Sequence, residues 1–294
     1  MEKKAFVNSD GDFLIMPEKG RLDIQTEMGK LMVRPGEMVV VQSGLKFKVS
    51  LPDGPSRGYV REIYAAHFEL PELGPLGATG LADMRDFEHP IAGFDIDRTN
   101  WEIVYKITGQ LLHANRITPL LMLSDGLEIT CHHADPSSLA LLTARSKVPG
   151  TPLVDICVIG PHWDVMDGYG PPYFHRNSAC ELITFVTVPS SGTFRPAFES
   201  GIVNYQTVFA PHGPLAAEHK TAVEEKLGPT YNYDGFIIEP SSPLLFTEFA
   251  RKSPKFKEHD VALWKGLEPT FMKHVDQVNA RLKAAGLPLL VQGN

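Results

Sequence analysis

Cysteine and long apolar runs are both scarce in this sequence of 294 residues. Its three cysteines, Cys131, Cys157 and Cys180, form no CxxC pair, and so low and odd a count fits reduced thiols in a cytosolic protein. No stretch of about 18 apolar residues is present, so no segment is expected to span a bilayer. The N-terminal sequence MEKKAFVNSDGDF lacks the apolar core of a signal peptide. We therefore expect a cytoplasmic, soluble protein.

Long blocks of lysine and arginine are absent too, and the formal net charge is −7. Nucleic acid and anionic membranes are therefore not expected as partners. Hydrophobic residues make up 43% of the chain, which is enough for a sizeable core. The 25 glycines and 24 prolines indicate many turns, and frequent turns favour short strands over long helices.

The first 70 residues have the pattern of short strands. In LDIQT (22–26) apolar and polar side chains alternate with period two, and RPGE (34–37) reads as a turn before the valine-rich MVVVQ. Such spacing favours a β-sandwich or barrel. Residues 71–100 show no clear period and form the best boundary. We expect one β domain over residues 1–95, without metal, and a second over residues 96–294.

The second half adds both strands and helices to this prediction. The apolar segment LVDICVIG (153–160) reads as a buried strand, and FIIEPSSPLLFT (236–247) returns to β. Helices are predicted over 135–145, where Asp135 could cap the N-terminus, over 213–227, and near the C-terminus up to Gly286. The fold class predicted is mainly β with a few peripheral helices.

A possible metal site is suggested by His175, Glu181 and His212. Two imidazoles and one carboxylate are the ligands of many non-haem Fe(II) sites. Residues six apart lie roughly 20 Å apart in a straight strand and point about 240° apart in a helix, so the chain would have to bend within RNSAC (176–180). His212, between a proline and a glycine, could project from a neighbouring strand end. On spacing alone, a metal site and an accidental grouping both remain open.

The other histidines carry less information. His133, in CHHADPS, lies just before the predicted helix at 135–145, where the helix dipole would keep its imidazole neutral and able to accept a proton. It could equally pack against the helix or cap it. His162 could line a pocket, and His67, between apolar neighbours, reads as a core histidine. Four others read as solvated: His89, His219, His259 and His274.

Several stretches together resemble the homogentisate 1,2-dioxygenase family, whose members are cupin-type, Fe(II)-dependent ring-cleaving enzymes. They keep the family's order along nearly the whole chain. The matching stretches are NSDGDFLIMPEKG (8–20), HFELPELGPLGATGLADMRDF (67–87), HADPSSLALLTARS (133–146), PPYFHRNSACE (171–181) and PHGP (211–214).

The resemblance implies a bicupin fold with Fe(II) held by His175, Glu181 and His212. It also implies that His133 is the catalytic base, taking or sharing the proton of a substrate hydroxyl. The substrates implied are a small phenol and O₂, and both oxygen atoms would enter the opened ring. Family members assemble as trimers that pair into hexamers, so a homo-oligomer is expected here.

The chain departs from the family pattern at positions near the implied site. It lacks a long N-terminal segment of the family, and the stretch between Pro119 and Cys131 is shorter. A tyrosine and a histidine that orient homogentisate in the family are replaced by Ser190 and Gln206. The candidate substrate-binding residues are Tyr173, Tyr205, Gln206 and His162.

These departures favour a dioxygenase that opens the ring of another hydroquinone or catechol. A true homogentisate 1,2-dioxygenase is the alternative, although no clear basic partner for an acetate group stands out apart from Arg176 and Arg195. A non-catalytic cupin paralogue that only binds a ligand or a partner is a second class, and a metal-dependent isomerase that does not use O₂ is a third.

Overall fold

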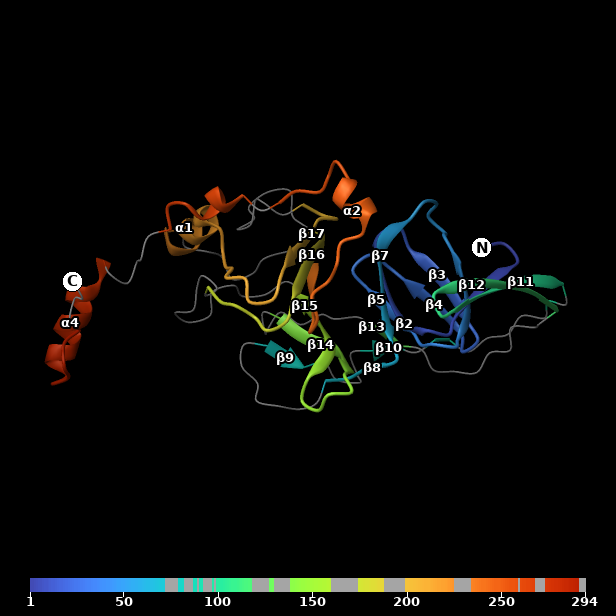
Figure 1. The fold of residues 1–294 in the computed structure, drawn as a ribbon, viewed down its shortest axis with the longest axis horizontal. Coiled ribbons are helices and arrows are strands. Elements are labelled where there is room, and N and C mark those ends of the chain that lie inside the picture. Colours follow the sequence, from blue (N-terminus) through green and yellow to red (C-terminus); the bar gives the residue numbers. More distant parts are fainter. Residues whose placement is uncertain are drawn as a thin grey trace.

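The computed structural model of this chain is mainly β, which confirms the predicted fold class (Figure 1). Its described residues form three sheets and a few short helices. The structure describes residues 1–71, 79–81, 87–88, 90–91, 97, 99–117, 127–129, 138–159, 174–187, 199–224, 234–258, 260–267 and 273–290.

The first sheet has six strands in the order β12-β11-β1-β6-β3-β4. Strand β1 pairs with β11 in parallel, and the other neighbours pair antiparallel. The strands are β1 (Lys4–Asn8), β3 (Leu22–Thr26), β4 (Lys30–Val33), β6 (Lys46–Ser50), β11 (Asn100–Ile107) and β12 (Gln110–Ile117).

The second sheet has five strands in the order β10-β13-β5-β2-β7. Apolar side chains of its strands β2 and β5 pack against those of β3, β4 and β6 in the first sheet, so these two sheets form a sandwich. Phe6, Phe13 and Phe47 stack edge-on or tilted at one end of this core. The strands are β2 (Gly11–Lys19), β5 (Met38–Val41), β7 (Arg57–Tyr64), β10 (Phe87–Glu88) and β13 (Leu127–Ile129).

The third sheet has seven strands in the order β17-β16-β18-β15-β14-β8, with β9 pairing parallel to β14. It lies beside the sandwich in Figure 1. The strands are β8 (Phe68–Glu69), β9 (Thr79–Leu81), β14 (Ser138–Arg145), β15 (Pro152–Ile159), β16 (Glu181–Thr187), β17 (Val203–Gln206) and β18 (Asp234–Pro240).

The third sheet packs one face against the second sheet. Leu142, Ile156, Leu182 and Ile238 are buried there, in one cluster with β2, β5 and β7. We call this side the core face. Side chains alternate along a strand, so residues between these lie on the opposite side, which we call the open face. On the open face Asp155, Cys157, Ile183, Ile237 and Glu239 are only half-buried. The open face is thus partly accessible, although Glu181 and Phe185 on it are buried.

Two expectations from the sequence are corrected by this topology. The segment predicted as a helix over 135–145 is strand β14 from residue 138 onward. The predicted boundary near residue 95 does not separate the sheets, because β11, β12 and β13 join the first two sheets while β8 and β9 join the third.

The helices are short and lie outside the sheets. Helix α1 (Ala216–Glu224) confirms the helix predicted over 213–227. The others are α2 (Glu248–Lys252), the 3-10 helix η2 (Val261–Trp264) and α4 (Val275–Ala284). Helix α4 ends before Gly286, whose positive φ fits the predicted cap, and it lies apart from the three sheets in Figure 1. Within the described residues, no helix is long and apolar enough to cross a membrane.

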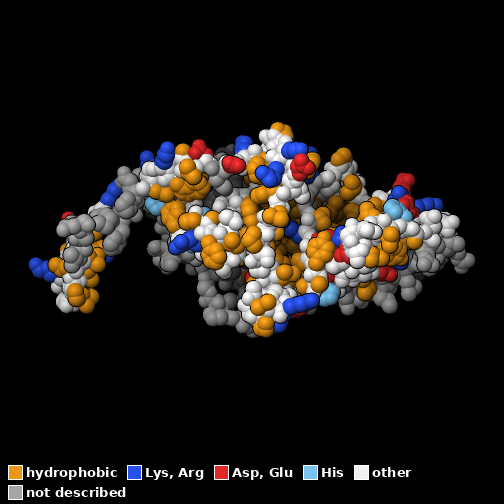
Figure 2. All heavy atoms as spheres, viewed as in Figure 1, with side chains coloured by type: hydrophobic (Ala, Val, Ile, Leu, Met, Phe, Trp, Pro, Cys, Tyr) orange, Lys and Arg blue, Asp and Glu red, His pale blue; other side chains and the backbone are white. Residues whose placement is uncertain are grey.

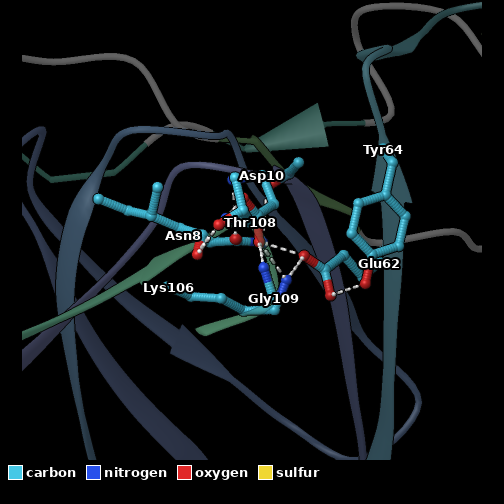
Figure 3. A network of polar contacts seen from close by, with 9 residues as sticks. Asn8, Asp10, Glu62, Tyr64, Lys106, Thr108 and Gly109 are labelled. Atoms are coloured by element: carbon cyan, nitrogen blue, oxygen red, sulfur yellow. Dashed lines mark hydrogen bonds and ion pairs between the residues drawn. The ribbon is translucent and has the colours of Figure 1, made fainter. Parts of the chain in front are cut away.

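A network of hydrogen bonds and ion pairs links strands of the sandwich at the β1–β2 turn (Figure 3). The Lys106 ammonium donates to Asp10 at 2.8 Å and to Glu62 at 2.6 Å, and Asn8 donates to Glu62 at 2.7 Å. The backbone N–H groups of Thr108 and Gly109 also donate to Asp10. The network therefore joins β7 to the β11–β12 hairpin.

The network predicts a change in acid stability when Lys106 is replaced by methionine. Hydrogen bonds from Lys106 and Gly109 hold the pKa of Asp10 below its usual value, which is about 3.9. A carboxyl with a depressed pKa stabilises the fold above its unfolded pKa, and that stability is lost as the pH falls through its folded pKa. We expect Lys106→Met to lower the melting temperature at pH 7. Below about pH 4 the melting temperature of the variant should decrease less with falling pH than that of the wild type. Melts from pH 2.5 to 7 test this, with exposed Lys257→Met as the control.

Candidate metal centre

Two distant segments meet at His175 and His212. The two residues form an isolated antiparallel bridge, in which each backbone N–H donates to the other's carbonyl at 3.0 Å. After His175 the chain bends at Ser178 and Ala179 before β16 begins at Glu181. The bend predicted within RNSAC is confirmed, and it allows His175 and Glu181 to approach one point.

The three side chains converge on one another. Their candidate ligand atoms all lie within 4.8 Å of each other. The Nε2 atom of His175 lies 3.5 Å from Oε1 of Glu181, and the Nε2 atom of His212 lies 3.3 Å from its Oε2. The two imidazole rings are 4.4 Å apart between centroids. Two imidazole nitrogens and one carboxylate on one side of a point leave the other side open for further ligands.

The chemistry of His212 fits a metal ligand. Its Nδ1 atom lies 2.9 Å from the carbonyl oxygen of Ala210 and is placed to donate its proton there. The Nε2 atom then carries a lone pair, and this atom is buried without a hydrogen-bond partner among the described residues. Buried polar atoms are rarely left unsatisfied. A metal ion would satisfy this one, and metal-bound histidines usually donate their other N–H in this way.

The Glu181 carboxylate is also bound by the side chain of Asn177. Its side-chain amide donates a short hydrogen bond to Oε1 of Glu181. Glu181 is only 5% exposed, and a buried carboxylate is costly unless hydrogen bonds or an opposite charge compensate it. Asn177 therefore orients the carboxylate toward the two histidines. The sequence pattern indicated only a bend within RNSAC (176–180) and did not indicate this hydrogen bond.

This hydrogen bond predicts that Asn177→Ala weakens metal binding without removing it. Loss of a group that orients a metal ligand typically costs about 10- to 100-fold in affinity. The expected result is a dissociation constant for Co(II) raised within that range, measured by the visible absorption of the bound ion. Asn115→Ala, an exposed position on β12, is the matched control and should leave the affinity unchanged.

The two candidate substrate contacts on β17 lie on opposite faces of the third sheet. Gln206 pairs with Glu181, so it shares the open face with that candidate ligand. Tyr205 pairs with Leu182 and packs against the core cluster. The Tyr205 hydroxyl lies 3.1 Å from Sγ of Cys180 and accepts from the backbone N–H of Leu244 at 3.2 Å. The idea that Tyr205 contacts substrate is therefore not supported by its position, and a structural role fits it better.

The remaining candidates are His133, His162 and Tyr173, which lie outside the described residues, as does Ser190. Residues 138–145 form strand β14 and not the helix whose N-terminus was expected to keep His133 neutral. The expectation of a core position for His67 was wrong. Its side chain is 61% exposed, and its Nδ1 atom lies 3.1 Å from Oδ1 of the buried Asp12.

Sequence patterns also missed two carboxyl groups on the open face, Asp155 and Glu239. Burial, together with the nearby carboxylates of Glu181 and Asp155, raises the pKa of Glu239 to about 7. Glutamate within the apolar run FIIEP (236–240) was the available signal. Without the strand pairing, nothing in the sequence places it beside Glu181.

Comparison with known proteins identifies a family over almost the whole chain. Residues 1–123 match the family model described as homogentisate 1,2-dioxygenase N-terminal, and residues 126–271 match homogentisate 1,2-dioxygenase C-terminal. Helix α4 lies beyond both matches.

Curated relatives give the same result. Homogentisate 1,2-dioxygenase of Oryza sativa subsp. japonica is 42% identical over 245 residues, which cover 76% of this chain and 51% of that protein. The proteins of that name from Homo sapiens and Emericella nidulans are 36% and 35% identical, each over 92% of this chain and 66% of its own length. The chain thus spans between half and two thirds of these relatives.

Among solved structures, protein Ylba from E. coli gives a TM-score of 0.33 at 8% identity, over 82% of this chain and 72% of that one, which is too weak to support an argument. The matches to both family models and to the curated relatives establish the family. The chain belongs to the homogentisate 1,2-dioxygenase family.

Proposed function

We propose that this chain is an Fe(II)-dependent homogentisate 1,2-dioxygenase, which opens the aromatic ring of homogentisate with O₂. The observation that carries the proposal is the convergence of His175, Glu181 and His212 in a chain of this family. The sequence departures favoured a different hydroquinone or catechol. The names of the relatives favour homogentisate itself, so the original alternative becomes the main proposal.

In this proposal His175, Glu181 and His212 hold the iron. Bound Fe(II) would polarise the substrate hydroxyl and pass electron density from the substrate, which is the group oxidised, to O₂. The protein's own contribution begins with orientation. Ala210 fixes the proton of His212 on Nδ1, and Asn177 fixes the carboxylate of Glu181. Both hold the ligand atoms in place before the metal arrives, which lowers the cost of binding it.

The substrate roles proposed for other residues follow the resemblance. His133 would accept the proton of a ring hydroxyl as that oxygen approaches the metal. Gln206 would contact the substrate from β17, since it lies in register with Glu181 on the open face. Tyr173 and His162 are proposed as further contacts.

The proposed assembly is a cytoplasmic homo-oligomer, a trimer or hexamer as in the family. What supports an interface is the exposure of large apolar side chains near α2, including Leu245 at 94% and Phe249 at 88%. In Figure 2 apolar side chains also lie exposed between the charged side chains on the visible face. Light scattering on the purified protein measures the molar mass of the assembly and so tests whether it is a trimer or a hexamer.

Oxygen uptake tests the proposed activity. Protein loaded with Fe(II) under anaerobic conditions is mixed with homogentisate and with a panel of other hydroquinones and catechols. We expect uptake and a ring-opened product with homogentisate, and none with a His175→Ala control. Uptake only with another member would favour the different phenol. Stoichiometric iron without any uptake would favour the non-catalytic paralogue.

A further inference from the structure

A row of polar side chains crosses the open face of the third sheet at the metal centre. Thr143 pairs with Asp155, and Asp155 pairs with Glu239. The register Leu182↔Ile238 places Glu239 beside Glu181, and Glu181 pairs with Gln206. Cross-strand partners share a face. Five neighbouring strands thus align three carboxyl groups, and one of these is the candidate metal ligand.

Within the part of the chain that the structure describes, the one opposing charge near Glu239 is that of His175, which acts to lower the pKa of Glu239 and would be neutral as a metal ligand. Among the described residues, neither Asp155 nor Glu239 takes part in an ion pair, and Asp155 accepts only the Thr143 hydroxyl, at 2.6 Å. Both side chains are half-buried, so they border the accessible side of the sheet. A bound metal would compensate the charge of Glu181 and so remove one of the causes that raise the pKa of Glu239. Glu239 would then ionise more readily and, with Asp155, carry the surplus negative charge.

The thiol of Cys157 lies close enough to be influenced by the same three carboxyl groups. Cys157 lies two residues from Asp155 and therefore on the same face. Burial, together with the carboxylates of Glu239, Asp155 and Glu181, raises the pKa of its thiol to about 12. All three carboxyl groups therefore act on one small region, which gives this flank of the metal centre a negative potential.

We propose that Asp155 and Glu239 are specificity-determining residues, which repel the carboxylate of an anionic phenolic substrate from this flank and so fix which end of the ring faces Glu181. The inference rests on the proposed function and deepens it. Like charges in a partly dry site repel strongly. An acetate group would then lie away from the β15–β18 side, and a ring hydroxyl, which can donate a hydrogen bond to a carboxylate, would face it.

The test compares homogentisate with its methyl ester, which lacks the negative charge. Each is titrated without oxygen into the full chain loaded with Co(II), and binding is followed by the visible absorption of the metal. In the Asp155→Asn/Glu239→Gln double variant, we expect the affinity for the acid relative to the ester to rise roughly tenfold, from the removal of like charge near the site. Each single variant should give a smaller rise in the same direction, and the singles are decisive if the double variant does not fold.

The control removes the same charge elsewhere. Glu248 and Glu258 are exposed and outside the third sheet. Glu248→Gln/Glu258→Gln should leave the ratio unchanged. An unchanged ratio in the open-face variants, with normal Co(II) binding, would overturn this inference and leave the proposed function standing. Failure of both ligands to alter the wild-type Co(II) spectrum would instead contradict the proposed function and the inference with it.

Discussion

Replacing His212 with alanine is expected to abolish stoichiometric iron binding and, with it, oxygen uptake. His212 supplies one of three ligand atoms, and its Nε2 atom is buried with no hydrogen-bond partner among the described residues. Binding free energies of structural zinc sites, taken here as a guide, are on the order of 10–16 kcal/mol for about four ligands. One ligand is then worth about 3 kcal/mol, which corresponds to a loss of about 100-fold or more in affinity. Anaerobic Fe(II) titration with a competing chelator measures it.

The control for His212 is another histidine beside a carboxylate. His113 on β12 lies 2.6 Å from Glu102 but is 58% exposed and belongs to the first sheet. His113→Ala should leave iron affinity within about twofold of wild type, since a surface pair of this kind contributes little. Equal loss of iron in both variants, or full iron binding by His212→Ala, would contradict the assignment of the ligands.

Replacing Ile156 with alanine is expected to give the largest loss of stability. Ile156 is 1% exposed and belongs to the cluster that joins the second and third sheets. Truncation of such a side chain removes buried apolar surface and leaves a cavity, which together cost about 2–5 kcal/mol. We expect the urea concentration at the unfolding midpoint to fall, with little change in the dependence of the unfolding free energy on urea concentration.

Val148→Ala is the matched apolar control, because Val148 is 62% exposed in the loop after β14. Its expected effect lies within about 0.5 kcal/mol. Comparable destabilisation by the two variants would mean that the core face of the third sheet does not pack as described.

Local patterns predicted the parts of the fold that depend on neighbouring residues. Alternation in LDIQT (22–26) matches β3, and the apolar run at 153–160 matches β15. The error at 135–145 has a local cause. The pairing of β14 with β15 shifts register between Ala140 and Leu142, and Leu141 and Leu142 are both buried, so the alternation typical of a strand is broken. Leucine and alanine then read as helix formers, and tertiary packing overrides that propensity.

The candidate ligands could be predicted because the resemblance supplied their positions. Spacing alone required a bend between His175 and Glu181, and the structure has it. The polar row could not be predicted in this way. Asp155, Glu181 and Glu239 lie on three strands whose pairing is not local, and only the register shows that they share a face. Tyr205 and Gln206 show the same limit, since one residue of offset decides which face a side chain occupies.

The most direct test of the metal centre is anomalous diffraction at the iron absorption edge from crystals of the Fe(II)-loaded protein. The expected result is one strong peak per chain, within about 2.0–2.3 Å of Nε2 of His175, Nε2 of His212 and a carboxylate oxygen of Glu181, distances usual for such ligands. A peak coordinated by other residues, or no peak in protein that carries iron in solution, would contradict the account.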